Sequence, residues 1–580
     1  MNMTRICALF ALSLLILGCS PPGSDSTDEP TADASTEDFS TADGGETSLY
    51  WGDTHLHTSY SFDAYGLGNR STDPNSAYRF AKGMPVVHPG HRSLVKIDRP
   101  LDFLVVTDHA EFLGVVPEIA AGNPQLLTSD LGRLWHEMLT TPGRENEFFN
   151  DFVARGSTDP ASIAFLSDEG IVRTVWSKIV DAAERHNDPG TFTAFSGWEW
   201  SSAPGGLNLH RIVFTPDGKD KAMQYLPYSL LESEKPRDLW NFLARTAEEF
   251  DTDFVAIGHN ANISNGRFFP LEDEFGEPVN ADYAEQRRRW EPVVEMTQYK
   301  GDSETHPILS PSDEFADFER YKHTLDGAPV VHEIGSYVRS GLLRGLKMES
   351  ELGINPYKFG MIGATDSHTG MSAAEEGNFL GKYAQDSTPE NKAKETVPGS
   401  VGWDASAMGL AGVWASENTR DAITAAFRRK EVYATTGPRI QLRVFGGWEF
   451  NAADAEARDF AANGYANGVP MGGDLTNAPE GQAPTLLISA TKDPLDGNLD
   501  RVQVVKGWIG ADGNAEEHIY DVVWSGDREP DSNGRLPSVG NTVSLDTGRY
   551  ENSIGATRLT SVWADPDFDP ALRAFYYIRV

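Results

Sequence analysis

The chain has 580 residues, of which 39% are hydrophobic and 10% aromatic, so it is long enough for more than one domain and a large buried core. Its 86 acidic residues outnumber its 49 basic residues and give a formal net charge of −37. A surface of this charge repels nucleic acid and anionic lipid at long range, so we expect no nucleic-acid partner.

The N-terminus predicts export from the cytoplasm. Arg5 precedes an apolar stretch of about 12 residues, Ile6–Leu17, which is too short to span a bilayer but has the length of a signal-peptide core. It leads into Ile16-Leu17-Gly18-Cys19, which resembles the lipobox of bacterial lipoproteins and implies cleavage before Cys19 and a lipid on its sulfur. An ordinary secretory signal that carries a cysteine is the alternative.

Residues 1–19 are therefore assigned to a lipoprotein signal peptide, and residues 20–48, which are polar and rich in Ser, Thr, Asp, Glu, Gly and Pro, to a disordered tether. The chain has two cysteines, Cys7 and Cys19, so a mature protein lipidated on Cys19 contains no disulfide. We expect a cell-envelope protein on the periplasmic or outer-membrane side that meets the membrane only through the lipid on Cys19.

From about residue 49 to residue 437, short apolar strands alternate with stretches of helical periodicity. We expect strands at Leu101–Thr107, Thr191–Trp200, Phe254–His259, Val293–Gln298, Phe359–Thr365 and Leu410–Ala415, and helices at Val175–Ala183, Leu239–Phe250, Tyr337–Met348 and Thr419–Lys430. This alternation is typical of parallel β/α architecture, and a barrel is the expected form. The functional side chains of such a barrel belong at the carboxyl ends of its strands.

Three segments depart from a minimal barrel. Residues 115–190 predict a long, mostly helical insertion that forms a lid or wall over the site. Residues 372–406 are polar and Gly-rich and are expected to form a second active-site loop. Residues 438–580 predict an antiparallel β-sandwich. Its expected strands are Gln441–Phe445, Thr485–Ala490, Arg501–Trp508, His518–Trp524, Thr542–Leu545, Ser561–Trp563 and Phe575–Val580.

Six of the 14 histidines lie at or just after the ends of predicted strands. They are His55, His57, His109, His210, His259 and His368. Neutral imidazole together with carboxylate is the ligand set of divalent transition metals. Because functional residues of a β/α barrel gather at the carboxyl ends of its strands, these histidines predict a metal site there.

Four carboxylates accompany these histidines. Asp63 follows His57 closely, and Asp366 lies two residues before His368. Glu199 stands between two tryptophans, where a buried acid is costly unless it is paired or bound to metal. Asp108 precedes His109 and is either a ligand or an acceptor that orients an imidazole.

These residues resemble, in order and context, the metal-ligand motifs of the PHP (polymerase and histidinol phosphatase) superfamily of metal-dependent hydrolases. The resemblance covers residues 49–437 and is strongest to a family of large bacterial PHP-like proteins long catalogued as of unknown function. The segments that carry it are Gly258-His259-Asn260, Ser264-Asn265-Gly266, the stretch from Gln298 to Pro307, and the stretch from Gly363 to His368. The resemblance implies an α/β fold, a distorted (β/α)7 barrel with a helical insertion, followed by a small all-β module.

The resemblance also implies two or three divalent transition metals, manganese, zinc or iron. One metal would be bound by His55, His57, Glu199 and Asp366; a second by Glu199, His210 and His259; and a third by Asp63, His109 and His368. The ligand role of His210 is less secure than that of His259, because His210 follows Glu199 so closely. The insertion after His109 is longer than in compact members of the superfamily, and the resemblance implies further chain beyond Val580.

A multinuclear site of this kind predicts hydrolysis of a small anionic ester, because metal ions supply a bound hydroxide and clamp a phosphoryl-like group. Four residues are candidates to bind the anion or to protonate the leaving group: Lys300, His306, Arg211 and Arg267. Of these, Lys300 ends a predicted strand, and His306 is the natural general acid if it faces the metals.

Our hypothesis is therefore a phosphate mono- or diester hydrolase. A sulfate-ester hydrolase is the nearest alternative, because a tetrahedral anionic centre uses the same clamp. A C–N hydrolase of the amidohydrolase type is a further alternative. A protein of another class, a lipid-anchored binding protein with a degenerate barrel, is disfavoured because every ligand position is filled.

Overall fold

The central sheet begins at β1 (Ser48–Asp53). The computed structural model describes residues 47–580 except residues 159, 398, 406–407 and 533, together with all side chains in this range except those of residues 145, 156–158, 160–161, 164 and 376. The predicted signal peptide (1–19), with Cys19, and the predicted tether up to residue 46 lie outside the described residues.

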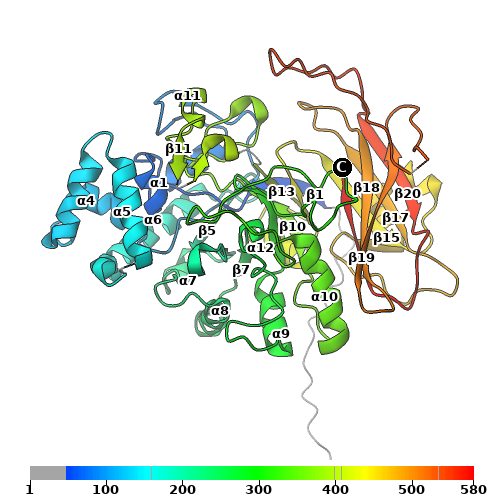
Figure 1. Cartoon of the computed structure of the whole chain (residues 1–580), viewed down its shortest axis with the longest axis horizontal. Coiled ribbons are helices and arrows are strands. Elements are labelled where there is room, and N and C mark those ends of the chain that lie inside the picture. The colour runs from blue at the N-terminus through cyan, green and yellow to red at the C-terminus, as the bar shows by residue number, and fades with distance from the viewer. Residues whose placement is uncertain (1–46, 159, 398, 406–407, 533) are drawn as a thin grey trace, which may run out of the picture. The chain divides into compact units, whose positions relative to one another are not determined.

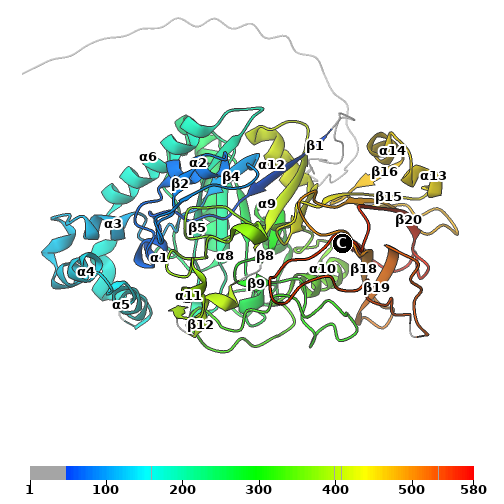
Figure 2. The same cartoon turned by 90° about the horizontal axis from the view of Figure 1, so that it is seen from above.

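A curled, mixed sheet forms the centre of the fold (Figure 1, Figure 2). Its strands follow the order β10-β8-β7-β6-β5-β4-β1-β13-β14, and β9 pairs with β8 outside this path. After β1, the bounds are β4 (Phe103–Val106), β5 (Thr193–Trp200), β6 (Arg211–Thr215), β7 (Val255–Gly258), β8 (Val293–Gln298), β9 (Gly301–Asp302), β10 (Gly360–Gly363), β13 (Leu410–Ala415) and β14 (Val432–Thr435).

Strand direction brings one set of ends together. β1, β4, β5, β7, β8 and β10 run the same way, whereas β6 runs antiparallel to both of its neighbours and β13 antiparallel to β1 and β14. The segments that follow β1 and β10 pair directly, since the Asp366 amide donates to the His55 carbonyl at 2.8 Å and the His57 amide to the Ser367 carbonyl at 2.9 Å. The expected α/β class is thus confirmed, but the reversed strands make the sheet more complex than a simple (β/α)7 repeat.

Buried strands and amphipathic helices build the core around this sheet. β4 and β7 are buried along their whole length, which is why they read as continuous apolar runs. The helices of this part are α1 (Phe62–Gly66), α2 (Pro74–Ala81), α7 (Lys219–Ala222), α8 (Pro236–Phe250), α9 (Ala281–Trp290), α10 (Val338–Leu352), α11 (Pro389–Lys392) and α12 (Arg420–Arg429). Two short strand pairs are β2 (Val86–Val87) with β3 (Leu94–Val95) and β11 (Glu395–Val397) with β12 (Ser400–Val401). Of the helices that the structure describes, none has the length and apolar character needed to cross a membrane.

The described residues of the segment predicted as a helical insertion form four α-helices. They are α3 (Val115–Ala120), α4 (Asp130–Thr140), α5 (Glu145–Thr158) and α6 (Glu169–His186). The predicted apolar face of α6, which includes Val175 and Trp176, is buried. In α5, the Phe152 ring stacks on Phe62 at 5.1 Å, and Phe62 in turn lies 5.0 Å from the His109 ring. The insertion therefore forms a wall beside a predicted metal ligand.

The C-terminal strands form two antiparallel sheets (Figure 1). One contains β15 (Gln441–Gly447), β16 (Gly468–Pro470), β17 (Thr485–Thr491) and β20 (Arg558–Ala564), and the other β18 (Arg501–Ile509), β19 (Ala515–Trp524) and β21 (Ala574–Arg579). Apolar side chains of both sheets, such as Ile488 and Val504, pack in one cluster. The sequence had not predicted the helices α13 (Ala452–Ala455) and α14 (Phe460–Asn467). The prediction of a strand at Thr542–Leu545 is wrong. This segment is a loop that buries no apolar face, and its Leu545 is 94% exposed.

Candidate metal centre

Nine predicted ligand residues meet at the carboxyl edge of the sheet, and all nine are buried. Most lie where a strand ends: His55 and His57 after β1, His109 after β4, Glu199 near the end of β5, His259 after β7, and Asp366 and His368 after β10. Asp63 lies in α1. His210 precedes β6, and because β6 is reversed, its first residue lies at the same edge, opposite Trp200 of β5. These nine residues are called the metal centre below.

Three overlapping groups in the metal centre could hold ions. His57, Asp63, His109 and His368 form the first group, His55, Glu199 and His259 the second, and His55, His57 and Asp366 the third. Within each group, one ligand atom per residue lies within 4.8 Å of the others. His210 joins them through Nδ1, which lies 2.7 Å from Glu199 Oε1. The grouping resembles the predicted one with two differences. His57 also lies with Asp63, His109 and His368, and His55 takes the place predicted for His210 beside Glu199 and His259.

The donor atoms of the metal centre fit divalent ions. His55 Nε2 and His57 Nε2 lie 3.2 Å apart, and His57 Nε2 lies 3.0 Å from Glu199 Oε2. Glu199 Oε2, Asp366 Oδ1 and His259 Nε2 are buried and have no hydrogen-bond partner in the described part of the chain. Unpartnered buried acceptors are costly, and a cation shared between them removes that cost. Imidazole and carboxylate donors at this spacing are suited to zinc, manganese or iron.

Surrounding side chains orient the imidazole rings. His57 Nδ1 lies 2.8 Å from Ser61 Oγ, whose hydroxyl donates to Asp108 Oδ1 at 2.9 Å. The Ser61 oxygen therefore accepts from His57 Nδ1–H, and the lone pair of Nε2 points into the centre. Asp108 also accepts from the Thr58 amide at 2.6 Å. Of its two predicted roles, the geometry favours the acceptor that orients an imidazole, acting through Ser61.

Several supporting residues were not found from the sequence. Glu295 Oε2 lies 3.0 Å from His55 Nδ1, and Ser201 Oγ lies 2.5 Å from His109 Nδ1. Glu295 is an acid inside the apolar strand β8, a signal of the kind that drew attention to Glu199. Ser201 carries no comparable signal, since its role depends on where β5 places it.

Two lysines contact Asp366. Lys300 Nζ contacts Asp366 Oδ2, and its side chain is 12% exposed. Lys382, which is 2% exposed, donates to the Asp366 carbonyl at 2.7 Å and to Asp366 Oδ2 at 2.8 Å, and it lies 3.2 Å from His368 Nδ1. Lys382 comes from residues 372–406, so this segment does reach the site, although the sequence did not single out the lysine.

Electrostatics favour ionised carboxylates in the metal centre. Burial by itself favours the neutral carboxyl of Asp366, but Lys300 and Lys382 outweigh it and hold the pKa of Asp366 well below its usual range. Burial also favours the neutral form of His109, which by itself would lower its pKa. The carboxylates of Glu199 and Asp63 outweigh this effect and raise the pKa of His109 to about 10. The carboxylates therefore draw positive charge toward the centre, as a metal site requires.

Backbone strain is present at two ligand segments. Asp366 has φ of +55° and Asn260, next to His259, has φ of +50°. Such values are uncommon for residues other than glycine and persist only where the surroundings impose them. Gln298 ties the two together, since its Nε2 donates to Asn260 Oδ1 at 2.6 Å and to Asp366 Oδ2 at 2.7 Å.

Four residues were predicted to take part in the reaction. Among the described residues, the side chain of Lys300 contacts a ligand residue, Asp366, and those of the other three do not. Arg211 instead pairs with the buried Glu291, Nε to Oε1 at 3.0 Å, because it directly follows His210 and consecutive side chains of an extended segment point to opposite faces. Arg267 is exposed. His306 is half-buried and stacks on His332 at 3.8 Å.

Comparisons with known proteins give one family and one structural likeness. No curated protein matches the chain. A solved structure from Bacteroides vulgatus, a two-domain protein containing a predicted PHP-like metal-dependent phosphoesterase, is similar at 10% identity and a TM-score of 0.30, covering 90% of this chain and 96% of that one. The family described as "Protein of unknown function (DUF3604)" matches residues 45–580, and the chain belongs to this family.

Proposed function

We propose that the protein is a metal-dependent hydrolase of phosphate esters, with a PHP-type barrel. The observation that supports this most strongly is the metal centre: nine buried ligand residues from distant parts of the chain, with carboxylate and imidazole atoms that lack partners. Divalent ions bound there would activate water and neutralise charge on a tetrahedral anionic group.

The two lysines take different roles in this proposal. Lys382 donates to the carbonyl and to Oδ2 of Asp366 and is 2% exposed, so it holds Asp366 in place. Among the described residues, the Lys300 ammonium group contacts Asp366, and its side chain is 12% exposed, more than that of Lys382. Its ammonium group therefore has protons available for an oxygen of the substrate or of the leaving group.

His306 is less suited to this task than the sequence predicted. Burial, followed by the neighbouring His332, lowers the pKa of His306 to about 4, so its imidazole is mostly neutral at pH 7 and a weak source of protons. We assign the contact with the anion to Lys300 for this reason, and we assign no role in the reaction to Arg211 or Arg267.

A paired substrate assay tests the ester class. The purified protein is loaded with manganese, zinc or iron and assayed with aryl phosphate monoesters, phosphodiesters and aryl sulfates. Metal-dependent turnover of a phosphate ester, with no turnover of the matching sulfate, is the expected result. Turnover of the sulfate alone would replace the phosphatase proposal with a sulfatase, and bound metal without turnover of any ester would favour a binding protein.

We also propose that the chain is anchored in the cell envelope by a lipid on Cys19, as its N-terminal sequence indicates. Metabolic labelling with a radioactive fatty acid in a bacterial host tests this. The full-length chain should incorporate label and Cys19→Ser should not. An unlabelled full-length chain would contradict the anchor and leave the metal centre unaffected.

A further inference from the structure

Residues 299–305, called the Lys300 loop below, comprise the turn after β8, the short strand β9 and the residues that follow it, and this segment is tied to the metal centre at its beginning. Lys300 contacts Asp366 through Nζ, and its carbonyl accepts a hydrogen bond from Asn262 Nδ2 at 2.9 Å. Asn262 also forms two hydrogen bonds with Ser303. The backbone amide of Asn262 donates to Ser303 Oγ at 3.2 Å, and the Ser303 hydroxyl donates to Asn262 Oδ1 at 2.9 Å. Asn262 follows His259 by three residues, so these bonds join the Lys300 loop to a ligand segment.

The end of the same loop is held by the C-terminal module. Glu304 Oε1 accepts from the Tyr577 hydroxyl at 2.6 Å, from Arg339 at 2.7 Å and from Arg579 at 3.1 Å. Asp313 accepts from Arg339 at 2.8 Å and from Arg579 at 2.7 Å. Tyr577 and Arg579 belong to β21. These five residues are called the junction network below; their two carboxylates pair with two guanidinium groups, and Arg339 also pairs with Glu517 at 3.3 Å.

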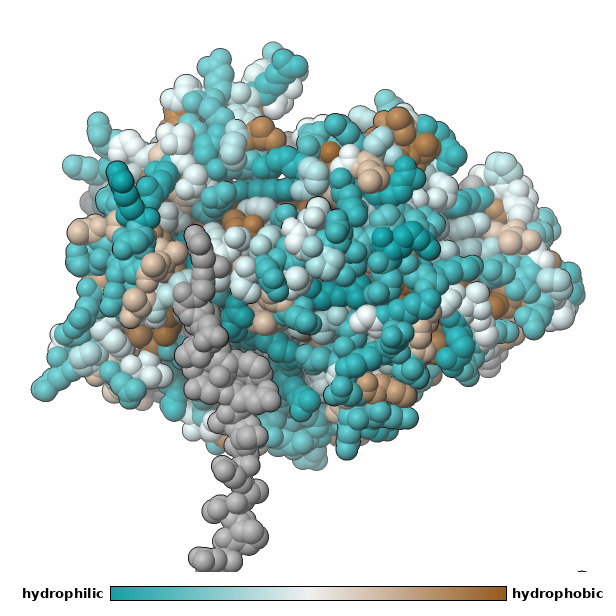
Figure 3. Space-filling model, turned by 180° about the vertical axis from the view of Figure 1, so that it is seen from behind, coloured by the Kyte–Doolittle hydropathy of each residue, from teal (hydrophilic) through white to brown (hydrophobic). Residues whose placement is uncertain are grey.

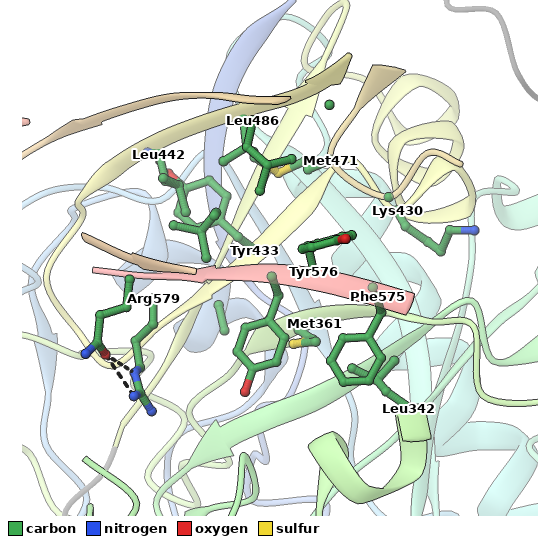
Figure 4. A pocket seen from close by; sticks show the side chains of 18 of the residues that line it. Leu342, Met361, Lys430, Tyr433, Leu442, Met471, Leu486, Phe575, Tyr576 and Arg579 are labelled. Atoms are coloured by element: carbon green, nitrogen blue, oxygen red, sulfur yellow. Dashed lines mark hydrogen bonds between the residues drawn. The ribbon is translucent and has the colours of Figure 1, made fainter. Parts of the chain in front are cut away.

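A cavity lies beside the junction network. It has a volume of about 1190 Å³ and is lined by barrel residues such as Leu342 and Met361 and by module residues such as Leu486 and Phe575. Figure 4 shows these side chains around the cavity, with Arg579 at one side of it and β21 running past. β21 meets the barrel through apolar contacts as well, since Phe575 and Tyr577 pack against the core cluster that contains Leu342.

We infer that β21 is a positioning element for the proposed reaction: it fixes Glu304 and thereby holds the Lys300 ammonium group against Asp366. The inference rests on the proposed function for the role of Lys300. Tyr577 and Arg579 touch no ligand residue in the described part of the chain, so they act through the Lys300 loop and are positioning residues. The C-terminal module thus contributes to the reaction although its sheets carry none of the metal centre.

A double-mutant cycle tests whether the effect passes through Lys300. Arg579→Met and Tyr577→Phe should each lower kcat/KM on the order of tenfold with metal content retained, since a small displacement of a reacting group costs this much. In a Lys300→Met background the same changes should cause almost no further loss. A full, additive loss in that background would overturn the inference, as would unchanged kcat/KM in the single variants.

Hydrogen exchange gives a readout that needs no activity. Amides of residues 299–305 should exchange faster in Arg579→Met than in the wild type. The matched control is Arg99→Met, which removes another ion pair between barrel and module, Arg99 to Asp493 at 2.8 Å, without touching the loop. Equal exchange in the loop of wild type and Arg579→Met would overturn the positioning role. If the wild type hydrolysed no ester, the proposed function would fail while exchange still decided whether β21 holds the loop.

Discussion

Two clusters of buried charge lie at the two ends of the Lys300 loop, and their polar atoms are partnered differently. In the metal centre, Glu199 Oε2, Asp366 Oδ1 and His259 Nε2 are buried, and no described residue gives them a hydrogen bond. In the junction network, Glu304, Asp313, Arg339, Tyr577 and Arg579 have no buried side-chain atom without a partner among the described residues. The metal centre therefore has atoms available to bind a ligand, whereas the junction network has its polar atoms paired and serves to connect the barrel and the module.

Backbone geometry supports the same distinction. Asp366 in the metal centre has a positive φ, whereas none of the five residues of the junction network does. Strain and unpartnered atoms together mark a site where stability is given up for function. The charges of the junction network are paired within the protein, in part with Glu517 and Gln503, as the charges of a buried ion-pair cluster must be if it is to hold the barrel and the module together.

The largest expected effect comes from removing ligands. The double variant His55→Ala with His57→Ala should lose metal and lower kcat on the order of a thousandfold or more, because each of the three groups of the metal centre then loses at least one donor. Circular dichroism should show the fold retained. His518→Ala, which changes an exposed histidine of β19, is the control and should keep both metal and turnover. Turnover that survives in the double variant would place the reaction elsewhere.

The two lysines should separate positioning from substrate contact. Lys300→Met should retain metal and lower kcat/KM on the order of a hundredfold, because its ammonium group is assigned to the anion. Lys382→Met should weaken metal retention and lower the free energy of unfolding by about 1–3 kcal/mol, since it leaves buried acceptors of Asp366 unpaired. Elemental analysis measures the metal retained by each variant, and denaturant unfolding measures its free energy of unfolding. The reverse pattern, metal loss in the Lys300 variant alone, would exchange the assigned roles.

The junction network should show a smaller effect that appears in acid. Burial raises the pKa of Asp313, but Arg579 and Arg339 outweigh it and lower the pKa to about 2, below the unfolded value of about 3.9. The ionised carboxylate therefore stabilises the folded state above pH 4, and this contribution, on the order of 2 kcal/mol, is lost as the pH falls from about 4 to about 2.

The contribution of the Asp313 charge is measured by unfolding the wild type and Asp313→Asn at a series of pH values from neutral to about 2. The variant should be less stable at neutral pH, and the difference between the two proteins should shrink as the pH falls. A difference that stayed constant from pH 6 to pH 2 would mean that the Asp313 charge does not stabilise the fold.

Local patterns predicted much of the fold and the positions of the metal centre. Apolar runs such as Val293–Gln298 coincide with strands, and histidines directly after such runs, such as His259, reach the carboxyl edge because backbone continuity leaves little freedom. The strand expected at Thr542–Leu545 does not form, because these apolar side chains have no surface to pack against and stay exposed. The sequence pattern could not show this, since it does not reveal which segments meet in the fold.

Side chains whose role depends on packing over long sequence distances were not predictable. Lys382 reaches Asp366 only because residues 372–406 fold back over the site, and Glu295 supports His55 across the sheet. Arg211 was a candidate for the pocket because it follows His210, but side chains of consecutive strand residues point to opposite faces, and Arg211 pairs with Glu291. The sequence thus located the centre but not the residues that complete it.

The most direct test of the account is the metal content of the purified protein. After expression with manganese, zinc and iron supplied, elemental analysis should find about two to three transition-metal ions per chain in the wild type and fewer in the His55→Ala, His57→Ala variant. Less than one ion per chain in the wild type would contradict the metal centre, and with it the proposed reaction.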